Sequence, residues 1–284
     1  MSAGKVVPEE RRTLVALGGG GFTMEPDNPA LDDFVLDLAL DAHRARRGAG
    51  QAADGDRARI VFLPTASGDP TGQINAFRAR FGGRVDCAAE QLGLFSLHDS
   101  TRTVPEVVAG ADVIYAGGGS MRNLLAIWRA HGLDKLLREA WERGTVLAGI
   151  SAGAMCWFEG GVTKSSGPPE PIAGLGVLPG SLSVHADGEP ERLPIWLAAV
   201  RSGELPGGWA ADDGCALLFR GRKFERAVSS RPGASALRVD AVEGELVRQR
   251  IDVELLDAPT LGGGPPSDDI LELRRVQRLR GGRR

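Results

Sequence analysis

A pentapeptide in the middle of the chain has the residue types of a nucleophile elbow. Gly149-Ile150-Ser151-Ala152-Gly153 matches Gly-x-Ser-x-Gly, in which small flanking residues permit a strained turn that exposes the serine hydroxyl. The pattern alone is weak support, because forty glycines in 284 residues make a chance match at about 0.3 per chain. The surroundings of Ser151 must therefore decide between a nucleophile and a plain tight turn.

The residues on both sides of Ser151 favour a nucleophile. Residues 145–150 form a short apolar run that predicts a buried strand, and the apolar residues 155–158 follow in a helix-compatible run. A serine between such a strand and helix lies at a helix N-terminus, where partial positive charge stabilises a developing anion. The alternative is a βα turn whose small residues only allow close packing.

A glycine-rich loop upstream can supply hydrogen-bond donors to the same site. Residues 117–119 are all glycine and follow the apolar run 111–116, and a backbone without Cβ atoms can approach a substrate closely. Together with the N–H of Ala152, this loop could form an oxyanion hole for acyl transfer. A phosphate-binding turn is the other interpretation, but neither Walker nor Rossmann spacing is present.

The histidines are few, which narrows the search for a general base. They occur at positions 43, 98, 131 and 185. His43 and His131 fall on predicted helices and His98 in a polar loop, so these three are read most simply as surface or packing residues. His185 follows a predicted strand and comes after Ser151, the order of hydrolase sites of this type. By elimination His185 is the best candidate, although a lone histidine is more often structural.

Composition excludes several other classes of function. The net charge of -3 arises from 34 basic and 37 acidic residues, which argues against nucleic-acid and membrane partners. We find no apolar stretch of about 20 residues that could span a bilayer, and the polar residues 1–12 do not resemble a signal peptide, so we expect a cytoplasmic protein. Three scattered cysteines make neither a disulfide framework nor a metal site, and we expect no metal or cofactor.

The order of apolar and amphipathic segments predicts an α/β fold. The sequence predicts a mostly parallel sheet with helices on both faces, and antiparallel strands toward the C-terminus. We assign residues 1–12 to a flexible N-terminal segment, 13–257 to a single domain and 258–284 to a loosely attached tail rich in Gly, Pro and Arg. The predicted strands are 13–17, 59–63, 87–94, 111–116, 145–150 and 181–185, followed by an antiparallel meander at 215–219, 224–229 and 236–247; the predicted helices are 29–47, 73–81 and one or two between 124 and 141.

Three segments together are more specific than the pentapeptide: Ala116-Gly117-Gly118-Gly119-Ser120, residues 149–158, and Leu175-Gly176-Val177-Leu178-Pro179-Gly180-Ser181 leading to His185. With these segments, the sequence from about residue 14 to 219 resembles the serine peptidases that include dipeptidase E and cyanophycinase, which are built on a class I glutamine amidotransferase-like sheet. The resemblance implies that Ser151 is the nucleophile, that His185 is the base, and that Gly118 or Gly119 forms the oxyanion hole with Ala152.

One position departs from the family pattern. The family usually has an acidic residue between the serine and the histidine, and related sequences often read Thr-Asp-Ser where this one reads Thr163-Lys164-Ser165. Asp187 is too close in sequence to His185 to be favoured as the group that orients the imidazole. The remaining candidates for that group are Ser165, Ser166 and Glu170.

We therefore expect a serine-type peptidase that cleaves a peptide or amide bond in a small peptide substrate, in the manner of an exopeptidase or dipeptidase. The alternative is a catalytically weak or inactive member that acts as a binding or regulatory protein, because Lys164 replaces the usual acid. A homodimer is compatible with the sequence, which does not determine the oligomeric state.

Overall fold

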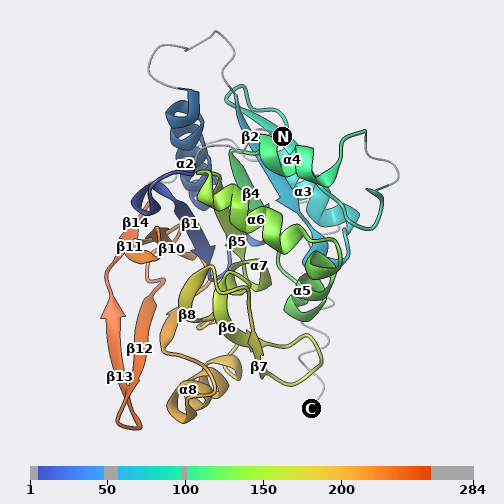
Figure 1. The fold of residues 1–284 in the computed structure, drawn as a ribbon. Helices are drawn as coiled ribbons and strands as arrows, with labels where there is room; N and C mark the ends of the chain where they lie inside the picture. The colour runs from blue at the N-terminus through green and yellow to red at the C-terminus, as the bar shows by residue number, and fades with distance from the viewer. Residues whose placement is uncertain (1–5, 48–56, 98–100, 257–284) are drawn as a thin grey trace.

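The computed structural model describes residues 6–47, 57–97 and 101–256. Its larger sheet has eight strands in the order β14-β11-β10-β1-β5-β4-β2-β3 (Figure 1). The strands from β1 to β3 in this order are parallel, whereas β10 runs antiparallel to β1 and β11 antiparallel to β10. The strands are β1 Thr13–Leu17, β2 Ala58–Leu63, β3 Cys87–Gln91, β4 Val113–Ala116, β5 Val146–Ile150, β10 Cys215–Arg220, β11 Lys223–Ser229 and β14 Val253–Leu255.

Helices cover both faces of the parallel strands, because alternate residues of these strands point to opposite faces and both sets are apolar. In β1, Leu14 and Ala16 belong to the core under α4, α5 and α6, whereas Val15 and Leu17 belong to the core under α1, α2 and α3. The helices are α1 Gly21–Met24, α2 Ala30–Arg47, α3 Thr71–Phe81, α4 Val104–Gly110, α5 Met121–Ala130 and α6 Leu133–Glu142, with short 3₁₀ helices at Glu9–Arg11 and Thr65–Ser67.

A second sheet lies beside the first, in the lower part of Figure 1, in the order β13-β12-β9-β8-β6-β7. Helix α8 packs on it through Trp196, which joins a core cluster with Val162 and Val239. The Trp196 indole N–H donates to the Ser181 hydroxyl at 2.9 Å, so its polar atom is satisfied although the ring is buried. The elements are β6 Phe158–Thr163, β7 Glu170–Ala173, β8 Leu178–Ser183, α8 Arg192–Ser202, β9 Gly208–Ala211, β12 Ala236–Val242 and β13 Glu245–Ile251.

The parallel sheet brings three loops to one edge. Strands β1, β4 and β5 are neighbours or next neighbours in the sheet and end at Leu17, Ala116 and Ile150. Because parallel strands end on the same side, the glycine-rich segments 18–21 and 117–119 meet Ser151 at the carboxyl edge, where ligands bind in open α/β sheets.

The predicted fold class is confirmed, and two of its details are wrong. The apolar run 155–158 after Ser151 is compatible with helix, but the helix α7 contains only Ala152–Met155, and residue 158 already begins the strand β6. The C-terminal strands do not form one meander, because β12 pairs with β9 and β13 in the second sheet while β11 pairs with β10 and β14 in the first. Alternation in a sequence shows that a strand has one buried face but does not identify its neighbours.

The structure describes most of the predicted N-terminal segment but not the predicted C-terminal tail. Residues 6–12, which belong to the segment predicted to be flexible, contact the domain: the Val7 N–H donates to the Glu142 carbonyl at 2.9 Å, and the Arg12 guanidinium lies over the Trp141 ring. The predicted tail, 258–284, lies outside the described residues.

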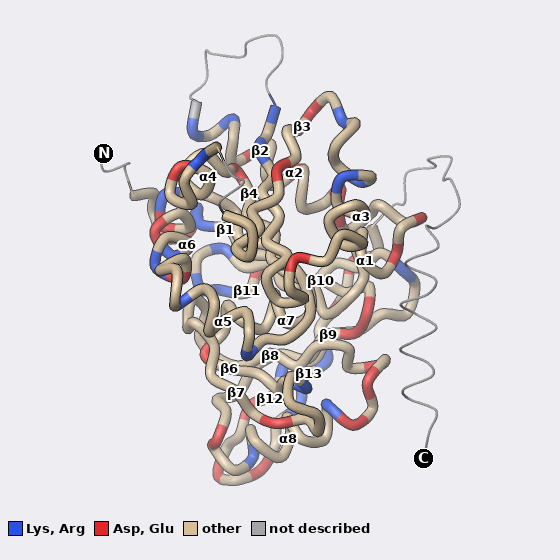
Figure 2. The backbone as a smooth tube through the Cα atoms, turned by 90° about the vertical axis from the view of Figure 1, so that its right-hand side faces the viewer, with Lys and Arg blue, Asp and Glu red and all other residues tan. Residues whose placement is uncertain are grey.

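Among the helices of the described part, none is long and apolar enough to cross a membrane. Figure 2 shows basic and acidic residues interspersed along the backbone.

Candidate active site

Ser151 lies at a sharp turn between β5 and α7. Its φ of 54° and ψ of -118° are unfavourable for a residue with a Cβ atom, and its N–H donates to the Leu17 carbonyl at 3.1 Å. The two glycines of the pentapeptide allow this turn: a Cβ on Gly149 would lie 2.0 Å from the Gly153 carbonyl oxygen, and one on Gly153 would lie 2.3 Å from the Ala116 carbonyl oxygen. The glycine pattern is therefore required by backbone contacts.

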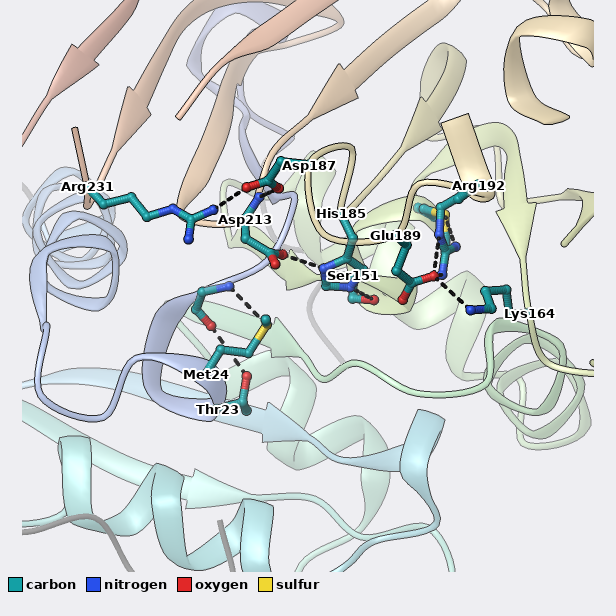
Figure 3. Close-up of polar contacts among 12 residues, drawn as sticks. Thr23, Met24, Ser151, Lys164, His185, Asp187, Glu189, Arg192, Asp213 and Arg231 are labelled. Atoms are coloured by element: carbon teal, nitrogen blue, oxygen red, sulfur yellow. Dashed lines mark hydrogen bonds and ion pairs between the residues drawn. The ribbon is translucent and has the colours of Figure 1, made fainter. Parts of the chain in front are cut away.

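His185 follows β8 and points its imidazole at this turn (Figure 3). Its Nε2 lies 2.8 Å from the Ser151 hydroxyl oxygen, although 34 positions separate the two residues. His185 also has a positive φ, 53°, and its N–H donates to the Gly18 carbonyl at 3.2 Å. The loop after β1 thus supports the backbone of the histidine as well as that of the serine.

A carboxylate stands behind the imidazole, and it belongs to Asp213. Oδ1 of Asp213 forms a short hydrogen bond with His185 Nδ1, and the two side chains are only 19% and 12% exposed. Asp213 lies in the turn between β9 and β10. A carboxylate at Nδ1 requires the proton on that nitrogen, which leaves Nε2 free to accept the proton of Ser151. The geometry is therefore that of a Ser-His-Asp triad in the chain order Ser, His, Asp.

The prediction that Ser165, Ser166 or Glu170 orients His185 is wrong, because Nδ1 of His185 is hydrogen bonded to Asp213. The Glu170 carboxylate accepts a hydrogen bond from Arg122 Nη2 at 2.7 Å, which with a smaller contribution from Ser166 lowers its pKa below the ordinary value. Lys164, at the position of the expected acid, binds Glu191 at 2.5 Å and Glu189 at 3.4 Å.

Asp213 was not predicted, because the family pattern has the acid between the serine and the histidine, whereas Asp213 lies 28 positions after His185. A local signal was present: Asp212-Asp213-Gly214 is a typical turn sequence between the apolar segments 208–211 and 215–219. That signal predicts a turn but does not indicate that the turn lies beside His185.

The loop between β4 and α5 lies against the serine. Hydrogen bonds hold its two ends, from Gly117 N–H to the Leu63 carbonyl at 2.9 Å and from Ser120 N–H to the Ala66 carbonyl at 2.7 Å. Between them, a Cβ on Gly118 would lie 3.3 Å from the Ser151 Cβ, and Gly119 has a φ of 141° that only glycine adopts readily.

Ala152 adds a further backbone donor next to Ser151. It is the first residue of α7, where a helix leaves its N–H groups without intrahelical partners. Of the predicted oxyanion-hole residues, Gly118 and Ala152 are thus adjacent to the serine, and Gly119 follows Gly118 in the same loop.

A second glycine loop, after β1, packs on the acid and the base. A Cβ on Gly19 would lie 1.9 Å from Asp213 Oδ1 and 2.9 Å from His185 Nδ1, so a side chain at this position would displace the carboxylate. The Gly19 carbonyl also accepts from the Gly214 N–H at 3.1 Å. No role for this loop follows from its sequence, because its position depends on the pairing of β1 with β10.

Comparisons with known proteins show the family to which the chain belongs. The model of peptidase family S51 matches residues 14–227. The chain is 44% identical over 245 residues to the uncharacterized peptidase YgaJ of Bacillus subtilis (strain 168), and the match covers 86% of this chain and 99% of that protein.

A solved structure has the same fold. The crystal structure of a peptidase from an acI-B1 Actinobacterium superposes with a TM-score of 0.63 at 21% identity, covering 87% of this chain and 96% of that one. The extent of the family match and the identity to YgaJ leave one assignment: this chain belongs to peptidase family S51.

Proposed function

We propose that this peptidase is a serine peptidase with the triad Ser151, His185 and Asp213. The observation that carries the proposal is the pair of contacts on one imidazole: Nε2 lies 2.8 Å from the Ser151 oxygen, and Nδ1 is hydrogen bonded to Asp213. This arrangement supports a general base with a defined tautomer beside a nucleophile on a strained turn.

In the proposed reaction, His185 Nε2 takes the proton of Ser151 as its oxygen attacks the carbonyl carbon of the scissile bond. The N–H groups of Ala152 and of Gly118 or Gly119 stabilise the oxyanion of the tetrahedral intermediate. The imidazolium then protonates the leaving amine, and the C–N bond breaks. A water molecule, deprotonated by His185, hydrolyses the acyl-enzyme and restores Ser151.

We further propose that the substrate is a small peptide cleaved in the cytoplasm, in the manner of dipeptidase E. Figure 3 shows charged groups of both signs, Glu189 and Lys164, on the side of His185 away from Asp213. These two side chains, which pair with each other at 3.4 Å, suit a substrate whose termini are both charged. The alternative, an inactive binding protein, was motivated by Lys164 in the place of the family acid, and the carboxylate of Asp213 behind His185 weakens that reason.

The test of this proposal is labelling with a fluorophosphonate probe together with hydrolysis of a dipeptide library. We expect the wild-type protein to be labelled on Ser151 and to cleave free dipeptides faster than their N-acetylated forms. Ser151→Ala should lose both activities, with at least about a thousandfold lower hydrolysis. A folded Ser151→Ala protein that retained full hydrolysis would exclude the mechanism, and wild-type protein that is neither labelled nor active would favour the binding protein.

A further inference from the structure

The backbone N–H of Asp213 joins the acid to the loop that carries the base. This N–H donates to Oδ1 of Asp187 at 2.8 Å, and Asp187 follows His185 by two residues. We propose that Asp187 is a positioning residue that holds Asp213 against the imidazole. The inference rests on the proposed serine mechanism and adds to it a group that contacts neither the nucleophile nor the imidazole nitrogens.

The position of Asp213 depends on this contact because its neighbours in the turn are held in another way. The Asp212 N–H donates to the Ser235 carbonyl and the Gly214 N–H to the Gly19 carbonyl, both at 3.1 Å. These main-chain bonds fix the two ends of the turn. Between them, the N–H of Asp213 is held by the side chain of Asp187. Loss of the Asp187 side chain should therefore move Asp213 and its carboxylate while the turn itself remains.

Arg231 holds Asp187 in its place. Its Nη2 lies 2.5 Å from Oδ2 of Asp187, so the two carboxylate oxygens of Asp187 contact Arg231 and Asp213 separately. The stem of Arg231 packs on Gly214, where a Cβ would lie 2.9 Å from Cγ of the arginine. The guanidinium also offsets the negative charge that Asp187 brings close to Asp213. Figure 3 shows the resulting series from Arg231 through Asp187, Asp213 and His185 to Ser151.

Two substitutions distinguish a positioning role of Asp187 from a contribution to the stability of the fold. Asp187→Ala removes the acceptor, whereas Asp187→Asn keeps an oxygen that can accept from the Asp213 N–H. The fold should survive both, because the same loops are also joined by the Ala186 N–H to the Ala211 carbonyl at 3.2 Å. The matched control is Asp240→Ala: Asp240 is similarly exposed, 43% against 40% for Asp187, and likewise paired with an arginine, Arg238.

The measurement is the second-order rate of fluorophosphonate labelling at Ser151. We expect Asp187→Ala to lower it about 10- to 100-fold, as misplacement of a catalytic group does, and Asp187→Asn and Asp240→Ala to keep nearly the wild-type rate. A wild-type rate in Asp187→Ala would overturn the inference, as would equal losses in Asp187→Ala and Asp187→Asn.

A second readout separates this inference from the proposed function. The far-downfield proton NMR resonance of His185 Nδ1–H reports its hydrogen bond to Asp213 without any chemistry at Ser151. It should shift in Asp187→Ala and remain in Asp187→Asn and Asp240→Ala. If the wild-type protein is not labelled, the proposed function fails, and the inference is then decided by this resonance: an unchanged signal in Asp187→Ala overturns it.

Discussion

Ser151 and His185 share an unusual backbone conformation. Their φ angles, 54° and 53°, lie in the left-handed region, at a cost of about 1–3 kcal/mol for each residue. Backbone hydrogen bonds to two consecutive carbonyls of the β1 end, those of Leu17 and Gly18, hold both residues in place. In this conformation the Ser151 hydroxyl and the His185 imidazole point toward each other.

At the residue scale, the test of the corrected triad compares two acids. Asp213→Asn places an amide N–H at His185 Nδ1, which favours the proton on Nε2 and prevents that nitrogen from accepting the Ser151 proton. We expect hydrolysis to fall about 10³- to 10⁴-fold with the fold retained. Glu170→Gln should change hydrolysis by less than about twofold, because an exposed ion pair contributes little.

The comparison is made by steady-state kinetics on a cleaved dipeptide, with circular dichroism to confirm folding. Equal losses in Asp213→Asn and Glu170→Gln, or a loss only in the latter, would contradict the geometry described above.

At the scale of elements, loops that leave neighbouring parallel strands build the site. The loop after β1 contributes no reacting side chain, yet its glycines permit the close approach of the turn that carries Asp213. The same edge receives the serine turn after β5 and the glycine loop after β4. The site is therefore an arrangement of backbone segments, and side chains in the wrong places would separate them.

This dependence predicts the effect of Gly19→Ala. Its Cβ would lie 1.9 Å from Asp213 Oδ1, so the carboxylate must move away from His185. We expect the fluorophosphonate labelling rate to fall about 100-fold. The control is Gly83→Ala, where a Cβ meets no atom within 4 Å, and which should leave the rate unchanged. A wild-type rate in a folded Gly19→Ala protein would show that Asp213 is not needed in its observed place.

At the scale of the whole molecule, a buried contact between a carboxyl and a guanidinium joins α2 to α3 beside the parallel sheet. Asp32 is fully buried, and Arg80 Nε lies 3.1 Å from its Oδ2. Burial raises the pKa of Asp32 to about 7, although the nearby Arg80 opposes the shift. The folded protein therefore holds a proton on this carboxyl at acidities where the unfolded chain has released it.

The sign of the resulting pH dependence follows from that proton. From about pH 4 to about pH 7 the folded state binds more protons at Asp32 than the unfolded state, so the free energy of unfolding falls as the pH rises. Asp32→Asn lacks this contribution. The stability of the wild-type protein relative to Asp32→Asn should therefore decrease between pH 4 and pH 8, by up to about 4 kcal/mol.

Urea unfolding at several pH values measures this difference, and Asp41→Asn, an exposed position on the same helix, is the control. Parallel curves for the wild-type protein and Asp32→Asn would show that Asp32 does not titrate in this range.

Much of the first sheet could be predicted from the sequence, because buried parallel strands are continuous apolar runs and the helices between them are amphipathic. The second sheet was harder to predict. The apolar run 155–158 suits either helix or strand and is followed by Glu159 and two glycines, so β6 shows no clear period. Strand β9, with its four residues Gly208–Ala211, is too short to show one.

The local features of the site could be recognised in the sequence, because the glycines around Ser151 and in the loop 117–119 form short, typical motifs. Gly149 is required by the serine turn itself, since its Cβ would meet the Gly153 carbonyl. Gly153 is required by a close approach to Ala116, which lies far away in the sequence. Asp213 is different, because it lies 28 positions from His185 and no local pattern connects them. It reaches the imidazole because β10 pairs antiparallel with β1 and brings the turn before it to the edge where β5 ends. Strand pairing between distant segments depends on tertiary packing. This packing, and not distance along the sequence, determines that Asp213 is the acid beside His185.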